Sequence, residues 1–304
     1  MMRTAVRWIG AAVMVWASAV GTAQKTTLLL WPGANPEASK VVGAEVVTTS
    51  VDAAGRSVVR ITNVSQPSLA VYTPAAVRTT GAAALVFPGG SYLWLSYTAE
   101  GTDICAWLNS IGMTCVLVKY RVPEDGHYPA NVEDLEDAQK AMRLTRAHAV
   151  EWGIDPHKVG VIGFSAGAHL AVALSTHPEF QGKNVAASTV DARPDFQMAI
   201  YPGWLTNPGG GAAVDPALAP TSAVPPTFLV QAENDYTAHV ENVLVYFEAL
   251  KDAKVPAELH VYTQGGHGFG MGQKEMPISG WTGLAESWLK TIHVLGPAGA
   301  VGMP

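Results

Sequence analysis

The sequence predicts an α/β protein: a single domain with a mostly parallel central sheet of about eight strands, flanked by helices. From residue 82 onward, short apolar runs bounded by glycine, proline or polar residues recur, and helix-length stretches separate most of them. Strands that alternate with helices form right-handed βαβ units, whose strands run parallel. The composition agrees, because 48% of the 304 residues are hydrophobic and can fill a large core.

The N-terminal segment has the pattern of a secretory signal peptide. Arg3 and Arg7 precede an apolar run over residues 8–20, and Gly21-Thr22-Ala23 offers small residues for cleavage. The run is shorter than the roughly 20 residues that span a bilayer, although an uncleaved anchor is the competing interpretation. We expect a signal peptide over residues 1–23 and a secreted or periplasmic protein with no membrane contact after cleavage.

The strands fall into two groups along the chain. Three short alternating segments come first and predict an antiparallel edge or early hairpins: Thr27–Leu30, Val58–Thr62 and Leu69–Tyr72. Six apolar runs follow and predict the main sheet: Ala82–Phe87, Met113–Lys119, Lys158–Gly163, Gln197–Tyr201, Phe228–Ala232 and Glu258–Tyr262.

The segments between these strands differ in kind. Leu135, Ala138, Met142, Thr145 and Ala149 recur at helical spacing and predict a helix with one face on the sheet. The segment from Pro202 to Pro226 has no clear period and is rich in glycine and proline, which predicts a long loop. We expect one α/β domain over residues 24–293 and a flexible tail over residues 294–304.

Charge and cysteine content narrow the partners. The net charge is −6 and no Lys/Arg cluster exists, which argues against nucleic acid as a partner. The only cysteines, Cys105 and Cys115, lie ten positions apart without nearby histidine spacing, and this is a poor ligand set for a metal. An exported protein permits a disulfide, but two buried thiols give the same pattern, so the pairing stays open.

A candidate nucleophile lies where a strand meets a helix. The strand that ends near Gly163 runs into Gly163-Phe164-Ser165-Ala166-Gly167, and the apolar stretch His169–Leu174 follows. A strand–turn–helix junction of the G-x-S-x-G type exposes the serine hydroxyl at the sheet edge, and the flanking glycines relieve crowding. Ser165 is therefore the expected nucleophile.

A base and an acid should follow the nucleophile in the order serine, acid, histidine. His267 lies in the glycine-rich segment 265–270, directly after the last predicted strand, where it can reach across the strand ends. The strand Phe228–Ala232 ends at Glu233-Asn234-Asp235. We favour Asp235 as the acid because it lies further into the loop, with Glu233 as the alternative.

An oxyanion hole is expected beside the nucleophile. The strand ending at Phe87 runs into Pro88-Gly89-Gly90-Ser91. The backbone N–H groups of Gly90 and Ser91, together with that of Ala166, can donate to a developing negative oxygen. An ordinary glycine turn is the alternative. The neighbouring strand–turn–helix junction at Ser165, called the elbow below, makes that alternative the weaker one.

These motifs together resemble the bacterial carbohydrate-esterase type of α/β-hydrolase, which includes acetylxylan and feruloyl esterases and is related to the hormone-sensitive-lipase group. Further matching segments spread the resemblance over nearly the whole chain after residue 23: Leu30-Trp31-Pro32-Gly33, Glu100-Gly101, Ala106-Trp107-Leu108-Asn109, Val118-Lys119-Tyr120-Arg121 and Asp137-Ala138-Gln139. The resemblance implies the α/β-hydrolase fold and a deacylase of plant polysaccharides that needs no metal or organic cofactor. Two residues depart from the family pattern, Ser91 in the oxyanion loop and Ala168 after the elbow.

The sequence thus leads us to expect a serine esterase that removes short acyl groups, acetyl first and feruloyl second, from a small-molecule or oligosaccharide ester. Aromatic side chains stack on sugar rings and on aromatic acyl groups, so five are candidates for the substrate wall: Tyr92, Trp94, Trp204, Tyr236 and Phe269. A serine exopeptidase is the nearest alternative, because the same fold and triad cleave amides. A non-catalytic binding module is the alternative from another class.

Overall fold

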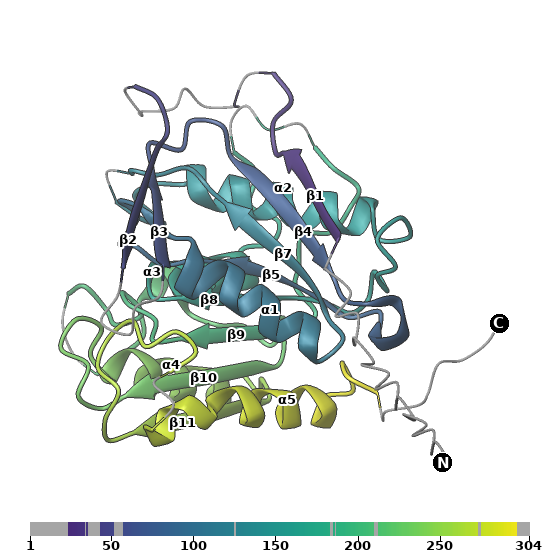
Figure 1. Cartoon of the computed structure of the whole chain (residues 1–304). Helices are drawn as coiled ribbons and strands as arrows, with labels where there is room; N and C mark the ends of the chain where they lie inside the picture. The colour runs from purple at the N-terminus through teal and green to yellow at the C-terminus, as the bar shows by residue number, and fades with distance from the viewer. Residues whose placement is uncertain are drawn as a thin grey trace, which may run out of the picture.

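An eight-stranded sheet runs through the middle of the protein in the computed structural model (Figure 1). The structure describes residues 24–296 except 34, 36–42, 52–56, 125, 183–184, 186, 210–211 and 273–274. The expected signal peptide and residues 297–304 lie outside the described residues.

The sheet is mostly parallel, as the sequence predicts. Its order is β1 (Gln24–Leu29), β4 (Ser68–Thr73), β7 (Thr114–Lys119), β5 (Ala83–Phe87), β8 (Val159–Phe164), β9 (Gln197–Ile200), β10 (Thr227–Ala232) and β11 (Ala257–Tyr262). The six strands from β7 to β11 are parallel, whereas β1 and β4 extend the sheet antiparallel at one edge. The expected antiparallel edge is therefore formed by β1 and β4.

The predicted strand Val58–Thr62 is present, but it belongs to a second, smaller sheet that the sequence did not predict. The strand β3 (Ser57–Thr62) pairs antiparallel with β2 (Val46–Val51) and β6 (Leu95–Ser96), apart from the main sheet. All of β2 is exposed, so it shows no alternation of apolar and polar residues. The strand β6 is only two residues long and gives no periodic signal.

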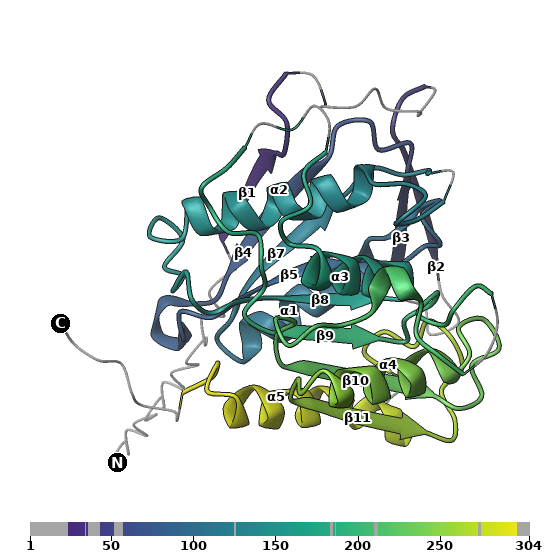
Figure 2. The ribbon, with the colours of Figure 1, turned by 180° about the vertical axis from the view of Figure 1, so that it is seen from behind.

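Helices cover both faces of the main sheet. The helices α1 (Asp103–Ser110) and α5 (Trp281–Thr291) lie on the face toward the viewer in Figure 1. The helices α2 (Glu133–Ala147), α3 (Ala166–Thr176) and α4 (Glu241–Asp252) lie on the opposite face (Figure 2). Short turns complete the structure: the 3₁₀ turns Ala76–Arg78, Pro216–Leu218 and Pro277–Gly280, and the π-helical turn Thr98–Thr102.

Two hydrophobic clusters, one on each face, hold these layers together. Every residue of the central strands β5, β8 and β10 is buried, which explains why their sequences are continuous apolar runs rather than alternating ones. The cluster with α1 and α5 also includes Val294 and Leu295, 6% and 4% exposed. The start of the expected tail is therefore packed against the domain.

A disulfide joins Cys105 of α1 to Cys115 of β7, which resolves the pairing that the sequence left open. Both residues are almost completely buried, and the bond ties the helix to the strand that it covers.

Among the described residues, the structure contains no helix with the length and apolar character needed to cross a membrane.

Loss of this disulfide is expected to destabilise the fold. The bond closes a loop with a sequence separation of 10, for which loss of unfolded-chain entropy corresponds to about 2–3 kcal/mol. Replacing both cysteines by alanine should lower the thermal midpoint by about 5–10 °C, measured by differential scanning fluorimetry. Reductant should lower the midpoint of the natural protein similarly and leave the variant unchanged. A natural protein indifferent to reductant would contradict the prediction.

Candidate active site

Ser165 lies at a sharp turn between β8 and α3, in a backbone conformation that few residues other than glycine adopt. Its φ is 52° and its ψ is −118°, and such strain is concentrated at functional sites. The turn depends on the glycines at either side. A Cβ at Gly163 would lie 2.0 Å from the carbonyl oxygen of Gly167, and one at Gly167 would lie 2.0 Å from that of Phe87.

The structure brings the three predicted side chains into one hydrogen-bonded chain. The Ser165 Oγ lies 2.8 Å from Nε2 of His267, and Nδ1 of His267 lies 2.7 Å from Oδ2 of Asp235. The His267 loop leaves β11 and is held by Asn234, whose Oδ1 accepts the N–H groups of Gly265 and Gly266 at 3.0 and 2.9 Å.

Asp235 is bound at both carboxylate oxygens and is only 1% exposed. Its Oδ1 accepts the N–H groups of Thr237 and Ala238, each at 2.9 Å. Burial opposes ionisation, but the hydrogen bonds from His267 and from these two N–H groups outweigh it and lower the pKa of Asp235. A carboxylate at Nδ1 favours the tautomer that leaves Nε2 free to accept the Ser165 hydroxyl proton. Glu233, the alternative acid, is exposed and has no contact of this kind with His267.

The predicted oxyanion loop lies directly against the elbow. A Cβ at Gly89 would be 2.9 Å from that of Ser165, and one at Gly90, with φ of 136°, would be 1.8 Å from the carbonyl oxygen of Trp94. Among the described residues, no hydrogen bond takes up the N–H of Gly90 or Ser91. Ala166 begins α3, where the first N–H groups have no partner within the helix. Three donors are thus available beside Ser165.

A cavity of about 290 Å³ opens at Ser165 and His267. Of the residues predicted to form the substrate wall, Trp204 lines it, together with Ser91 of the oxyanion loop. The other lining residues are mostly polar or small: His127, Gly203, Thr206, Pro208, Asp215, Thr237, Ala238, His239 and Asn242. Among the described residues, no group of three or more His, Cys, Asp or Glu side chains is arranged to hold a metal ion.

The other four predicted wall residues do not line this cavity. Tyr92 is 2% exposed and lies beneath the oxyanion loop. The ring of Trp94 lies under the guanidinium of Arg60, at 4.9 Å. Tyr236 is 84% exposed, and Phe269 packs edge-on against Tyr201 with 4.4 Å between ring centroids.

His127 and Asp215 are cavity residues that the sequence did not single out. His127 follows β7, well before Ser165 in the chain, and stacks on Trp204 with 4.9 Å between ring centroids. Asp215 lies in the long loop after β9 and is 7% exposed. The expected order of serine, acid and histidine directed attention to later histidines, and a single acid in an irregular loop carries no spacing signal.

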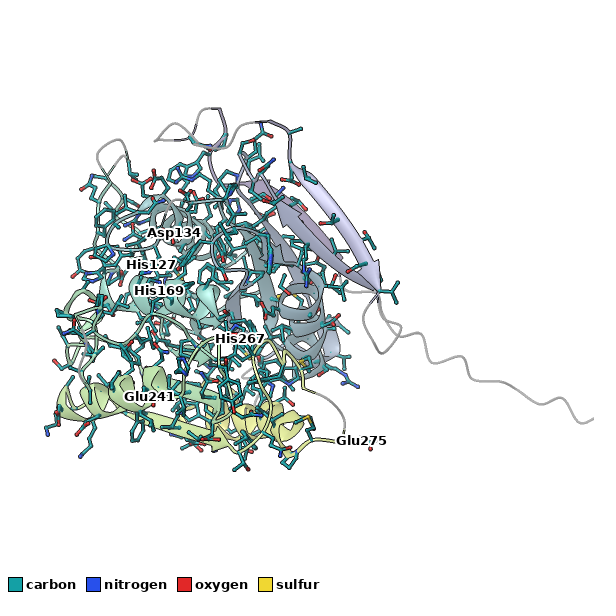
Figure 3. The ribbon with its side chains drawn as sticks, turned by 90° about the vertical axis from the view of Figure 1, so that its left-hand side faces the viewer. His127, Asp134, His169, Glu241, His267 and Glu275 are labelled. Atoms are coloured by element: carbon teal, nitrogen blue, oxygen red, sulfur yellow. A yellow bond between two sulfur atoms is a disulfide. The ribbon has the colours of Figure 1, made fainter. Side chains whose placement is uncertain are left out.

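Buried polar groups support the oxyanion loop from below. The Tyr92 hydroxyl lies 2.9 Å from Nδ1 of His169, and burial and the nearby Asp134 raise the pKa of Tyr92. His169 and Asp134 are labelled in Figure 3. Burial, with a smaller contribution from His127, lowers the pKa of His169 to about 3. Burial and the nearby Glu124 raise the pKa of Asp134 to about 8. Both groups are therefore largely neutral at pH 7, which removes the cost of burying charges there.

Known proteins resemble the chain in sequence and in structure. The BD-FAE family model matches residues 69–201. An acetylxylan esterase of Xylanibacter ruminicola is 32% identical over 64% of this chain and 42% of its own length. The endo-1,4-beta-xylanase B of Butyrivibrio fibrisolvens is 30% identical over 69% of this chain and 35% of its own length. The chain therefore spans less than half the length of these two curated relatives.

A solved structure covers far more of the chain. The acetyl ester-xyloside bifunctional hydrolase of Caldicellulosiruptor lactoaceticus superposes with a TM-score of 0.69 at 30% identity. The match covers 89% of this chain and 97% of that protein.

The hydrogen-bonded chain predicts which acid matters. Asp235→Asn should lower kcat for 4-nitrophenyl acetate by about 10²–10⁴-fold, because an amide at Nδ1 no longer favours the required tautomer. Glu233→Gln is the matched control, since the same chemical change is made two residues away on an exposed side chain. It should leave kcat within about twofold. A larger loss in Glu233→Gln than in Asp235→Asn would reverse the assignment of the acid.

Proposed function

The chain belongs to the carbohydrate-esterase type of α/β-hydrolase, and we propose that it is a serine carboxylesterase that removes short acyl groups, acetyl first, from plant polysaccharide or oligosaccharide esters. One observation carries the proposal: the hydrogen-bonded chain from Ser165 through His267 to Asp235 opens onto a cavity, and the three available backbone donors lie beside Ser165. The acetylxylan esterase and the acetyl ester-xyloside hydrolase support the choice of substrate.

The geometry supports hydrolysis in two halves. The Ser165 Oγ attacks the ester carbonyl carbon while Nε2 of His267 accepts the hydroxyl proton, and Asp235 stabilises the imidazolium that forms. The N–H groups of Gly90, Ser91 and Ala166 donate to the negative oxygen of the tetrahedral intermediate. His267 then gives the proton to the departing alcohol. In the second half, water activated by His267 releases the acid from Ser165.

The cavity favours a small acyl group over a feruloyl group. A ferulate slot between Trp94 and Trp204 is the basis for the feruloyl alternative, but only Trp204 lines the cavity. Ser91 also lines it and adds a hydroxymethyl group where the family usually has glycine. Both features reduce the room and the stacking surface for a long or aromatic acyl chain.

The remainder of the cavity suits the sugar part of the substrate. Trp204 is 39% exposed and offers an apolar ring face on which a pyranose can stack. Asp215 uses Oδ1 to accept the N–H of Ala217 at 2.8 Å, and no described residue donates to its Oδ2. That oxygen is available to accept a sugar hydroxyl.

We also propose that residues 1–23 direct export and are removed, so that the mature enzyme works outside the cytoplasm. The charge and hydrophobicity pattern of this segment supports the proposal. The disulfide between Cys105 and Cys115 supports it independently, because structural disulfides are rare in reducing compartments.

Ser165→Ala tests the nucleophile. This variant should hydrolyse 4-nitrophenyl acetate at least about 1,000-fold more slowly than the natural protein while keeping its thermal midpoint, because only the oxyanion donors and binding contacts remain. Retention of more than about a tenth of the activity in the folded variant would refute the mechanism. The natural protein should cleave the ester and leave an aminoacyl anilide intact, whereas comparable anilide cleavage would favour an exopeptidase.

The sugar subsite predicts a change in selectivity. Asp215→Asn and Trp204→Ala should lower kcat/KM for an acetylated xylo-oligosaccharide about tenfold more than for 4-nitrophenyl acetate, since only the former presents a sugar ring. Acetate release and nitrophenolate release are the two measurements. Asp191→Asn, an exposed carboxylate outside the cavity, is the control. An equal loss on both substrates would place the two residues outside the sugar site.

A further inference from the structure

A buried carboxylate that takes no part in the triad lies behind Ser165. Glu100 belongs to the π-helical turn Thr98–Thr102 and is 6% exposed. Its Oε2 accepts the N–H of Gly89 at 2.8 Å. A Cβ built on Gly89 would lie 2.8 Å from this oxygen and 2.9 Å from the Cβ of Ser165. The carboxylate and the nucleophile therefore flank the same glycine of the oxyanion loop.

The other oxygen of Glu100 leads to the histidine loop. Glu100 Oε1 accepts the hydroxyl of Tyr201 at 2.8 Å, and the Tyr201 oxygen accepts the N–H of Gly270 at 3.1 Å. Tyr201 follows β9, is fully buried, and lies edge-on to His267 with 5.3 Å between ring centroids. One continuous path of hydrogen bonds thus joins the oxyanion loop at Gly89 to the loop that carries His267.

The path requires one side chain in which both terminal oxygens accept a hydrogen bond. Each Glu100 oxygen faces a donor, so the ionised carboxylate is satisfied without a proton of its own. Burial is the largest influence on Glu100 and raises its pKa, and the bonds from Tyr201 and Gly89 offset only part of this rise. An amide in its place would turn an NH₂ group toward either the Gly89 N–H or the Tyr201 hydroxyl. If the NH₂ group faces Tyr201, the Tyr201 hydroxyl loses the acceptor for its proton. Its oxygen already accepts the N–H of Gly270, so the hydroxyl cannot turn without disturbing that bond.

The oxyanion loop and the His267 loop, which this path joins, both need to be held in position. Gly90 and Ser91 have positive φ angles, and so do Gly266, Gly268 and Gly270. Glycine-rich backbone is easily displaced, but an oxyanion hole works only when its donors are already in place. The turn that supplies Glu100 is π-helical, a geometry that often occurs at functional sites.

We propose that Glu100 and Tyr201 are positioning residues that hold the oxyanion loop and the His267 loop in register around Ser165. The proposal rests on the proposed esterase function and adds two residues to it. Neither side chain lines the cavity, so they act through the loops rather than on the substrate. Their loss should weaken transition-state stabilisation and leave ground-state binding largely intact.

Glu100→Gln, Tyr201→Phe and the double variant test this proposal with 4-nitrophenyl acetate. Rates are divided by the concentration of active sites titrated with an organophosphate, so that misfolded protein does not count. Each single variant should lower kcat by about 10–100-fold, as expected for small displacements of catalytic groups, with KM within about twofold. Because both residues belong to one path, the double variant should lose no more than about threefold beyond the worse single variant.

Tyr246→Phe is the matched control, because Tyr246 is equally buried and its hydroxyl bonds to Gln197, away from both loops. It should leave kcat within about twofold. If Glu100→Gln does not fold, Tyr201→Phe alone decides, since it removes only one hydroxyl.

Three outcomes are decisive against the path. A Tyr201→Phe enzyme that keeps more than half of the natural kcat would overturn the proposal. Losses that multiply in the double variant would do the same, because independent effects are not a shared path. Failure of the natural protein to hydrolyse the ester or react with the titrant would refute the esterase function itself, and with it the proposed role of Glu100.

Discussion

The backbone at Ser165 is the constraint on which the rest of the site depends. A positive φ at a residue with a side chain is unfavourable, and here it turns the chain sharply from β8 into α3. The turn is possible because the backbone of Gly167 packs against the carbonyl oxygens of Phe87 and Pro88 without room for a Cβ. The same close contact places the oxyanion loop beside the nucleophile. The turn at this residue therefore fixes both the Ser165 hydroxyl and the loop of the proposed oxyanion hole.

Loops that converge at the ends of parallel strands supply the remaining groups, and polar contacts hold each loop. Asn234 binds two N–H groups of the histidine loop, and Asp235 is itself held by two backbone donors. Glu100 connects the oxyanion loop to Tyr201. Such buried polar groups are favourable only when they are satisfied. Their placement around Ser165 is consistent with a site that needs fixed geometry more than it needs the stability that an apolar core would add.

The two faces of the sheet have different tasks. The face with α1 and α5 holds a cluster of large aromatic residues and the disulfide that joins α1 to β7. On the opposite face, α3 begins directly after Ser165. The loop after β9 brings Trp204 and Asp215 to the cavity. The strand–helix junction positions Ser165, whereas loops at the strand ends carry Asp235, His267 and most of the cavity residues.

The sequence by itself determined the main sheet and which three side chains, Ser165, Asp235 and His267, to expect in one hydrogen-bonded chain. It could do so because buried parallel strands are continuous apolar runs, and because the tight turn at Ser165 imposes glycines at fixed positions. It did not determine the sheet formed by β2, β3 and β6, since an exposed strand and a two-residue strand lack a periodic pattern.

Only the tertiary structure decided which aromatic residues reach the cavity and whether the two cysteines meet. Four of the predicted aromatic residues are close in sequence to the expected catalytic segments but do not line the cavity. Tyr92 is buried in the core, and Trp94 lies against Arg60. Tyr236 is exposed to solvent, and Phe269 packs on Tyr201. His127 and Asp215 come from distant loops and meet at the cavity. Loop side chains are directed by contacts between segments far apart in the chain, and local sequence patterns carry no record of those contacts.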